Sequence, residues 1–503
     1  MKGNSLRMIR SVMATLFFVA ITLLFLDITG ALHIWLGWMA KIQFLPAVLA
    51  LNVGVIVALI LLTLIFGRVY CSIICPMGVF QDVVTHFSVA RQRRKKNRKP
   101  FRYTKEVKWL RYGVWVLFII AIIAGIHAFV AILAPYSAYG RIVQNLFAPL
   151  YGWVNNLLAT LSERAGSYAF YSREVWLRSL PTFIVAALTL IAIVILAWRG
   201  GRTYCNTICP VGTTLSFFSR FALFRPVIDA DKCRNCKVCE HQCKASCINI
   251  DEHKIDYSRC VDCFNCIGSC KFDALKYRFA CGKDSSATPQ NVKADTGRRA
   301  FLSGAALAVG TAALQAQEKK VDGGLAAIED KVIPMRKTPI TPPGSLSAKN
   351  LSSHCTACQL CVSECPNNVL RPSGSLDRFM QPESSYERGY CRPECTRCSE
   401  VCPAGAIRRI DRNEKSSIQI GHAVWVKENC LPYTEGVSCG NCARHCPVGA
   451  ILMVPSDPDD ADSVKVPAVD SERCIGCGAC ENLCPARPLS AIYVEGHSVH
   501  KYN

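Results

Sequence analysis

The residues best suited to chemistry are cysteines, of which the chain of 503 residues contains 30. Most of them form six groups of four, and most groups repeat the spacing Cys-x2-Cys-x2-Cys-x3-Cys. Such a loop brings three thiolates to one iron–sulfur cubane, and a remote fourth cysteine completes the ligand set. Two groups lie in the first half, at Cys233, Cys236, Cys239 and Cys243 and at Cys260, Cys263, Cys266 and Cys270. Four lie in the second half, at Cys355, Cys358, Cys361 and Cys365, at Cys391, Cys395, Cys398 and Cys402, at Cys430, Cys439, Cys442 and Cys446, and at Cys474, Cys477, Cys480 and Cys484.

These groups predict about six [4Fe–4S] clusters. Zinc also accepts four thiolates, but its sites usually show separated Cys-x2-Cys pairs. Disulfides would not require six copies of one spacing. In two-cluster ferredoxins the fourth cysteine of one group ligates the other cluster. We therefore expect Cys270 to join Cys233, Cys236 and Cys239, and Cys243 to join the group that starts at Cys260. The pairing of the four later groups stays open.

Two further cysteine pairs belong to an internal repeat. The motif Arg-x-Tyr-Cys-x3-Cys-Pro occurs at 68–76 and again at 202–210. It contains Cys71, Cys75, Cys205 and Cys209. These four thiols could bind one metal or cluster, form a redox-active dithiol, or only shape two turns, and all three interpretations stay open. Cys247 and Cys281 belong to no group and are expected to be buried or free thiols.

Composition and absent motifs exclude several function classes. A chain of this length does not need disulfides to stabilise a small core. It has no Cys-x2-Cys-His motif for haem, no Gly-x-Gly-x2-Gly after a strand for a nicotinamide, and no evident flavin site. The net charge of +21 is concentrated locally, since residues 91–111 hold eleven Lys or Arg and one acid, Glu106. This block lies between apolar segments, so membrane topology explains it better than nucleic-acid binding does.

Four apolar segments predict a transmembrane four-helix bundle, at 12–28, 44–66, 112–134 and 181–198. About 20 apolar residues suffice to cross the hydrocarbon core. Lys and Arg near the N-terminus, in 91–111 and after Trp198 predict that these regions are cytoplasmic. The loops near 30–43 and 135–180 then lie outside. Within the second loop, residues 142–161 form either an interfacial helix or a packed one.

The sequence therefore predicts a multi-domain chain. Residues 1–222 form the membrane domain, 223–281 a cytoplasmic α+β ferredoxin-like domain with two clusters, and 351–503 an α+β domain with four clusters. Between them, 282–350 reads as a linker that contains a twin-arginine pattern at 297–303, followed by weakly apolar residues. A twin-arginine segment is a receptor-read export address. Its presence predicts that the four-cluster domain is periplasmic.

The motif order resembles two known protein families joined in one chain. Residues 1–281 resemble NapH in their four apolar segments, their two Cys-x3-Cys-Pro loops and their two-cluster module. Residues 297–503 resemble NapG and MauM in their twin-arginine leader and four cysteine groups. The resemblance implies a multi-pass protein of the bacterial inner membrane that acts as a quinol dehydrogenase module. It implies electron transfer from the quinone pool to a periplasmic reductase, typically nitrate reductase, or to a cytochrome c acceptor.

Iron–sulfur clusters without an organic cofactor transfer single electrons. We therefore expect a membrane partner that exchanges two electrons together with protons. Quinol, dissolved in the membrane lipid, is the candidate for that partner. Candidate proton acceptors at membrane depth or edge are Asp27, Asp82, His86 and His127. Two other functions stay open. One is export of electrons from a cytosolic donor without quinol, and the other is a ferredoxin-type accessory role in the assembly of another metalloenzyme.

Overall fold

The computed structural model describes residues 3–27, 30–94, 100–279 and 329–502. The predicted twin-arginine segment at 297–303 and the ungrouped Cys281 lie outside these residues. Helices account for the structure up to residue 219, and short helices alternate with two-stranded antiparallel sheets in the rest. The chain is multi-domain, as predicted, with one helical part and two cysteine-rich α+β parts.

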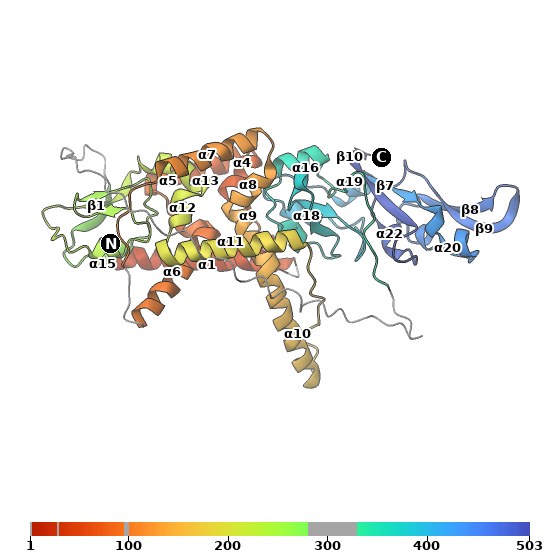
Figure 1. Cartoon of the computed structure of the whole chain (residues 1–503), viewed down its shortest axis with the longest axis horizontal. Helices are drawn as coiled ribbons and strands as arrows, with labels where there is room; N and C mark the ends of the chain where they lie inside the picture. Colours follow the sequence, from red (N-terminus) through yellow and green to blue (C-terminus); the bar gives the residue numbers. More distant parts are fainter. Residues whose placement is uncertain (1–2, 28–29, 95–99, 280–328, 503) are drawn as a thin grey trace, which may run out of the picture.

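The helical part is a bundle in which α1, α7 and α11 run along the long axis of the molecule (Figure 1). Its elements are α1 (Gly3–Leu26), α2 (Ala31–Leu36), α3 (Trp38–Lys41), α4 (Phe44–Leu49), α5 (Val53–Phe66), η1 (Tyr70–Ile74), α6 (Pro76–Arg94), α7 (Lys108–Ile123), α8 (His127–Leu133), α9 (Pro135–Ile142), η2 (Val143–Phe147), α10 (Ala148–Arg164), α11 (Leu180–Gly200), α12 (Thr203–Thr207) and α13 (Pro210–Ser219). Among the described residues, two helices are long and apolar enough to cross a membrane by length and composition, Ser5–Leu26 and Leu180–Gly200. Helix α5 is apolar but shorter.

The predicted segments 44–66 and 112–134 are not continuous helices. The first is interrupted at Leu51, which has a φ of 51°, and resumes at α5. There Asn52 Oδ1 accepts the backbone N–H of Val55 at 3.3 Å, which caps the new helix. The second breaks at Gly125, whose φ of 74° lies in the left-handed region that favours glycine. Apolar composition predicted both segments, but not these interruptions.

The two Cys-x3-Cys-Pro loops fold alike. In each loop the proline after the second cysteine begins a helix, α6 in the first repeat and α13 in the second. Proline suits the first helical turn, because its missing N–H would have no partner there. In the second loop Cys209 Sγ accepts the Gly212 N–H at 3.3 Å and caps α13. The loops are thus rigid connections at the ends of the bundle helices.

The first cysteine-rich part, residues 224–279, is here named the first module. Its strand β1 (Phe224–Ile228) pairs with β4 (Leu275–Phe279), and β2 (Ile248–Asn249) pairs with β3 (Lys254–Ile255). The cysteine loops lead into the short helices α14 (Val238–His241) and α15 (Asn265–Ser269). This symmetric arrangement of strand, loop and helix is the α+β plan that the spacing predicts.

The second cysteine-rich part, residues 329–502, is here named the C-terminal domain. It contains α16 (Ala348–His354), α17 (Leu360–Ser363), β5 (Leu370–Pro372), η3 (Leu376–Arg378), β6 (Pro382–Ser384), α18 (Arg397–Val401), α19 (Arg412–Ser417), β7 (Ile418–Trp425), η4 (Lys427–Asn429), α20 (Leu431–Glu435), α21 (Asn441–Arg444), β8 (Ile451–Asp457), β9 (Asp460–Val469), α22 (Ala479–Leu483) and β10 (Ile492–Tyr502). Strands pair as β5 with β6, β7 with β10, and β8 with β9, all antiparallel.

The first module and the C-terminal domain lie at opposite ends of the bundle (Figure 1). At one end the backbone N–H of Arg202 donates to Lys244 O at 2.9 Å. At the other end Asn145 Nδ2 donates to Gln359 Oε1 at 2.9 Å. The N-terminal end of α1 lies near the first module, whereas α9 lies near the C-terminal domain. The bundle therefore separates two cysteine-rich regions that the sequence also assigns to opposite sides.

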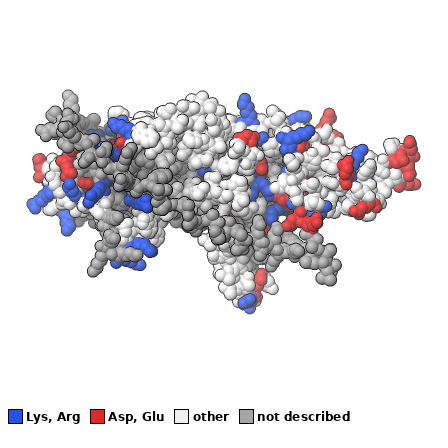
Figure 2. Space-filling model, viewed as in Figure 1, with Lys and Arg blue, Asp and Glu red and all other residues white. Residues whose placement is uncertain are grey.

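The surface of the bundle between its two ends carries few charged side chains, as the view in Figure 2 shows. Leu16 and Val19 on α1 are exposed, as are Leu188 and Ile191 on α11. Helix α10 projects from the bundle (Figure 1), and only its Gly152 and Ala159 are buried. Its apolar side chains are left uncovered, whereas Ile142 and Val143 at the start of the segment 142–161 are buried, so that segment is packed at its start and exposed along α10.

We expect the close contact between the two repeats to tolerate no added methyl group. A Cβ atom at Gly78 would collide with Cys71 O and Arg202 Nη1, and one at Gly212 with Cys205 O and Arg68 Nη2. Gly78→Ala and Gly212→Ala should each lower the free energy of unfolding by about 1–3 kcal/mol. Thermal unfolding of the purified protein would measure the loss.

The matched control is Gly113→Ala in α7, where nothing lies within 4 Å of the added atom. That variant should be neutral or stabilised by about 0.5–1 kcal/mol, because alanine favours helix. Equal stability of all three variants would contradict the packing described for the repeats.

Candidate functional site

The cysteines of the first module gather around two cavities, which we name cages 1 and 2. Cage 1 is lined by Cys233, Cys236, Cys239 and Cys270. Cage 2 is lined by Cys243, Cys260, Cys263 and Cys266. The fourth cysteine of each group thus faces the other group's cavity, which is the crossed arrangement expected from the sequence. Cys247 lies in the wall of cage 2, with its Sγ 3.5 Å from Cys243 Sγ.

The C-terminal domain brings its sixteen grouped cysteines together in the same crossed way, between neighbouring groups. Cys355, Cys358 and Cys361 lie with Cys402 in cage 3. Cage 4 consists of Cys365, Cys391, Cys395 and Cys398. Cage 5 consists of Cys446, Cys474, Cys477 and Cys480. Cage 6 consists of Cys430, Cys439, Cys442 and Cys484. The pairing that the sequence left open is therefore first with second and third with fourth.

The backbone of the regular loops suits an anionic cluster. In the loop from Cys233, residues Asn235 and Lys237 both have left-handed φ values, of 48° and 56°. The same two positions are left-handed in the loops from Cys260, Cys355 and Cys474. Alternating left- and right-handed residues turn successive N–H groups into a concavity that binds anions, including iron–sulfur clusters. In cage 3 the Ala357 N–H donates to Cys355 Sγ at 3.4 Å.

In cages 1, 2, 4 and 6 the cysteines line cavities. All 29 cysteines in the described residues are free of disulfides. Within the same residues, no group of three or more His, Cys, Asp or Glu side chains is arranged to hold a single metal ion. The arrangement therefore fits a cluster that fills the space between four thiolates. A [4Fe–4S] group in such a site supplies one-electron oxidation and reduction.

Cage 4, whose first spacing is widened, contains a lysine. Lys415 is 5% exposed and its Nζ donates to Cys391 Sγ at 3.2 Å. Burial lowers the pKa of Lys415, but the thiols of Cys391 and Cys398 outweigh burial and raise it. A buried cation next to the thiols favours the extra negative charge of a reduced cluster.

The four cysteines of the two Cys-x3-Cys-Pro loops, here named the central cysteines, are all buried together in the bundle. Cys71, Cys75, Cys205 and Cys209 are 4% to 5% exposed. Each thiol is close enough to the others for their charges to interact. Gln81 Nε2 also donates to Cys205 Sγ at 3.2 Å. The repeat thus brings its two halves to one site.

Two fully buried arginines hold the central cysteines reciprocally. Arg68, from the first repeat, donates through Nη2 to Cys205 O at 3.3 Å in the second. Arg202, from the second repeat, donates through Nη1 to Cys71 O at 2.6 Å in the first. Arg68 Nη2 lies 3.8 Å from Cys71 Sγ and Arg202 Nη1 lies 4.0 Å from Cys205 Sγ. The guanidinium groups therefore provide positive charge beside four thiols.

Polar contacts join the central cysteines to cage 2. The backbone N–H of Arg68 donates to Asp262 Oδ2 at 2.9 Å, and Asp262 lies between two cysteines of cage 2. On the other side Asp82 pairs with Arg10, with Arg202 at 2.9 Å and with Lys244 at 3.5 Å. Lys244 directly follows Cys243 of cage 2. These contacts join the central cysteines directly to cage 2.

A buried arginine lies between the central cysteines and cage 3. Arg141 is 0% exposed, and its Nη1 donates to Ala357 O at 3.4 Å. Tyr204 of the second repeat and Cys358 of cage 3 are both near enough to act on the charge of Arg141. The sequence analysis missed Arg141, although it is the one charged residue between 135 and 150.

The cages and the central cysteines form one succession. Cys266 of cage 2 is electrostatically coupled to Cys239 of cage 1. In the C-terminal domain Cys361 of cage 3 is coupled to Cys398 of cage 4, and the Cys391 N–H donates to Cys477 O of cage 5 at 2.9 Å. Cage 6 follows through the pair Cys442 and Cys480. The order is cage 1, cage 2, central cysteines, then cages 3 to 6.

The four candidate proton acceptors are not brought together. Asp82 is paired with cations near cage 2, whereas Asp27 accepts the Leu32 N–H at 2.7 Å at the other end of the bundle. His86 is exposed on α6, and His127 is half-buried at the start of α8. Asp27 and Asp82 therefore have structural partners.

Two family models match this chain. A model described as a 4Fe-4S binding domain matches residues 48–96 and 182–228, which include the four central cysteines. A model described as a 4Fe-4S dicluster domain matches residues 437–487, which include cysteines of cages 5 and 6. No solved structure matches the chain.

Several curated proteins are similar over part of the chain. The methylamine utilization ferredoxin-type protein MauM of Paracoccus denitrificans is 34% identical over 37% of this chain and 82% of its own length. The ferredoxin-type protein NapG of Escherichia coli is 31% identical over 43% of this chain and 94% of its own length. The MauM of Methylobacillus flagellatus is 32% identical over 29% of this chain, which spans 64% of that relative.

The crossed ligand sets make a prediction about iron content. Cys270→Ser should empty cage 1 and lower the iron content by about four atoms per chain, while cage 2 keeps its cluster. Iron and acid-labile sulfide analysis of the anaerobically purified protein measures the change, and electron paramagnetic resonance of the reduced protein counts the clusters.

Cys247→Ser is the matched control, because Cys247 lies beside Cys243 but outside the crossed set. It should retain the full iron content, whereas Cys243→Ser should lose about four atoms. The reverse result would show that Cys247 is the ligand of cage 2.

Proposed function

Because this chain belongs to the ferredoxin-type iron–sulfur electron-transfer proteins related to MauM and NapG, we propose that it is a membrane quinol dehydrogenase module. It oxidises quinol and delivers electrons to a periplasmic acceptor. The acceptor class suggested by its NapG relative is a periplasmic nitrate reductase, and a cytochrome c is the other. The six cages hold [4Fe–4S] clusters in this proposal.

One observation carries the proposal. The six cages lie at the two ends of an apolar helical bundle, and the central cysteines lie buried between them. A soluble ferredoxin has no need to separate its clusters with a bundle whose flanks expose leucine and isoleucine. A protein that moves electrons between two sides of a membrane needs that separation.

The distribution of charge supports a four-segment membrane bundle. The basic block from 91 to 111 adjoins the first module, where Thr104 N–H donates to Ser246 O at 3.4 Å. Positive loops favour the cytoplasmic side, which puts the first module in the cytoplasm and the C-terminal domain in the periplasm. The apolar face of α10 then lies along the outer membrane surface, as interfacial helices do.

The central cysteines act as a seventh redox centre in this proposal. Arg68 and Arg202 lie beside the thiols of Cys71 and Cys205, and Arg202 is also paired with Asp82, so Arg68 is the cation that lacks a carboxylate ion pair. An isolated buried cation costs several kcal/mol unless an anion offsets it. Four thiolates on an iron–sulfur group provide that anion, and the family model that covers both loops is described as binding 4Fe-4S.

A second function is favoured by one specific observation. Cys236 of cage 1 is exposed, and the first module that contains it lies at the end of the bundle opposite to the C-terminal domain (Figure 1). A soluble cytosolic donor therefore has access to cage 1, and electrons entering there would pass outward without quinol. The two functions differ in the donor, and the same experiment distinguishes them.

The proposal is tested with the whole protein in lipid nanodiscs under anaerobic conditions. A hydroquinone with a decyl tail should bleach the visible absorption of the oxidised clusters, and dithionite should add little further change. Clusters that respond to dithionite but stay oxidised with the hydroquinone contradict quinol oxidation. Clusters that respond only to a reduced soluble ferredoxin support the second function.

The central cysteines should be required for communication between the ends. In Cys205→Ser, a reduced soluble ferredoxin should still reduce cages 1 and 2, while cages 3 to 6 stay oxidised during the same interval. Freeze-quenched electron paramagnetic resonance resolves the two sets. Cys247→Ser, which alters a thiol outside the succession, is the control. Unchanged reduction of cages 3 to 6 in Cys205→Ser would remove the central cysteines from the electron path.

A further inference from the structure

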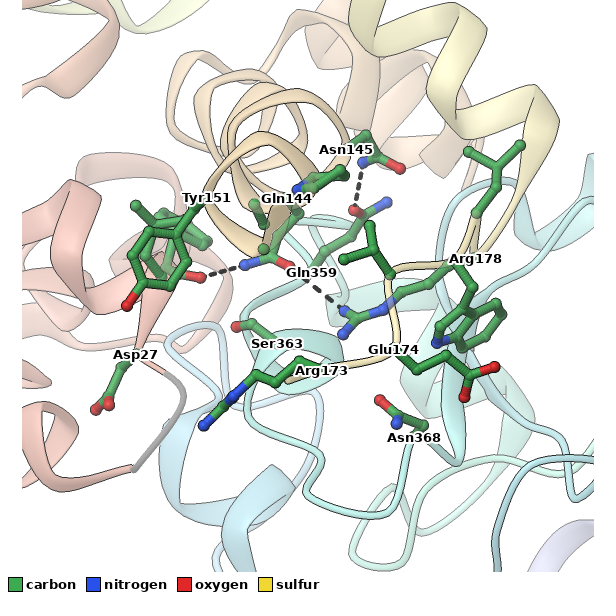
Figure 3. A pocket seen from close by; sticks show the side chains of 18 residues that line it. Asp27, Gln144, Asn145, Tyr151, Arg173, Glu174, Arg178, Gln359, Ser363 and Asn368 are labelled. Atoms are coloured by element: carbon green, nitrogen blue, oxygen red, sulfur yellow. Dashed lines mark hydrogen bonds between the residues drawn. The ribbon is translucent and has the colours of Figure 1, made fainter. Parts of the chain in front are cut away.

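A cavity of about 150 Å³ lies where the bundle meets the C-terminal domain. Its walls come from the end of α1, from η2 and α10, from the strand-like segment 173–178 and from the cysteine loop of cage 3. Figure 3 shows Gln144, Gln359 and Arg178 grouped at the cavity. The position corresponds to the outer edge of the bundle in the proposed topology.

One end of the cavity is polar and adjoins cage 3. Gln359, which lies between Cys358 and Cys361, is 2% exposed. Its Oε1 accepts from Asn145 at 2.9 Å, while its Nε2 has no hydrogen-bond partner among the described residues. Arg178 Nη1 donates to Val362 O at 3.0 Å, which fixes the Arg178 guanidinium at the same end of the cavity. A buried amide donor without a partner is costly. Gln359 Nε2 is enclosed by neighbouring atoms, so a rotation of the Gln359 side chain that brings Nε2 to a ligand oxygen in the cavity is favourable.

Apolar side chains line another part of the cavity, beside the charged Asp27, Arg173 and Glu174, and they continue onto the exposed face of α10. Phe25, Leu26 and Pro149 line the cavity, and so do Tyr151 and Trp176. Beyond Tyr151, helix α10 exposes a row of apolar side chains. These are Leu150, Trp153, Val154, Leu157, Leu158 and Leu161. A ligand with an oxygen-bearing ring and a long apolar tail matches both parts.

We infer that this cavity binds the ring of a membrane hydroquinone, with its isoprenoid tail along α10. The inference rests on the proposed quinol oxidation and names its site. Gln359 Nε2 donates to one ring oxygen, and Arg178 orients the amide of Gln144 beside it. Oxidation of one hydroquinone breaks two O–H bonds and releases two protons to water at the mouth. A cluster held by cage 3 would accept the two electrons one at a time, passing the first to cage 4 before it takes the second.

The variant Gln359→Gly removes the donor without straining the loop. Gln359 has a φ of 66°, and glycine already occupies the equivalent position of the last group, as Gly478 with a φ of 79°. The matched control is Lys237→Gly. Lys237 occupies the same loop position in cage 1, with a φ of 56°, and the first module that contains cage 1 lies at the other end of the molecule. A second variant, Ala148→Phe, fills the cavity from α10 without touching a cysteine loop.

The probe is a decyl-tailed quinone that carries a photoreactive azide, bound to the whole protein in nanodiscs. Labelled peptides should include residues 144–152 or 359–368. Affinity should fall about tenfold in Gln359→Gly, which corresponds to one lost hydrogen bond of about 1.4 kcal/mol. It should fall at least as far in Ala148→Phe and stay unchanged in Lys237→Gly. Iron content confirms that each variant keeps its clusters.

The outcomes separate the site from the function. Labelling elsewhere, with hydroquinone still reducing the wild-type clusters, overturns the site and leaves the proposed function standing. Absence of both labelling and reduction overturns the function and the site together. Displacement of the label by phosphatidylglycerol, but not by a decyl-tailed quinone without the azide, assigns the cavity to a lipid headgroup and overturns the inference.

Discussion

The reciprocal binding of Arg68 and Arg202 is the interaction on which the rest of the structure depends. Each guanidinium is 0% exposed and donates to a carbonyl oxygen of the opposite repeat. Buried cations of this kind persist only where anions or several acceptors surround them. The nearest groups able to carry the balancing charge of Arg68 are the thiols of the central cysteines. Charge balance therefore links Arg68 to the thiols, whereas Arg202 has the carboxylate of Asp82 as its partner at 2.9 Å.

The same arginines attach the first module to the bundle. Arg68 Nη1 donates to Ser258 O at 3.0 Å, next to cage 2, and the Arg202 N–H donates to Lys244 O. Contacts that organise the central cysteines are thus also the contacts that dock the module. Removing either arginine would disturb the site and the domain interface together. Asp82, placed against Arg202, belongs to the same set of contacts, and its role as a proton acceptor stays a prediction.

Spacing along the chain predicted the cages better than it predicted their surroundings. Three cysteines separated by two residues each can reach one cavity only through one kind of loop. The cysteine sets of cages 1 and 2 could therefore be predicted from spacing, including the crossed cysteines Cys270 and Cys243. Pairing among the later groups depends on how β7 and β10 bring distant segments together, which local spacing does not encode. Hydropathy likewise predicted the segments 44–66 and 112–134, but the break at Gly125 depends on a single left-handed residue. Gln359 had no sequence signal, because its role comes from facing Asn145 of a distant helix.

The position of the cavity resolves a difficulty in the electron path. In the proposed topology, if quinol met the protein only near cages 1 and 2, electrons bound for the periplasm would first have to enter the first module. The cavity lies instead beside Gln359 in the loop of cage 3, from which cages 4, 5 and 6 continue outward. Cages 1 and 2 then form a branch that reaches cage 3 through the central cysteines and Arg141. Arg68 and Arg202 then govern electron transfer from cages 1 and 2, whereas Gln359 governs electron entry from quinol. Substitutions of the arginines should affect reduction by a soluble ferredoxin, and substitutions of Gln359 should affect reduction by a hydroquinone.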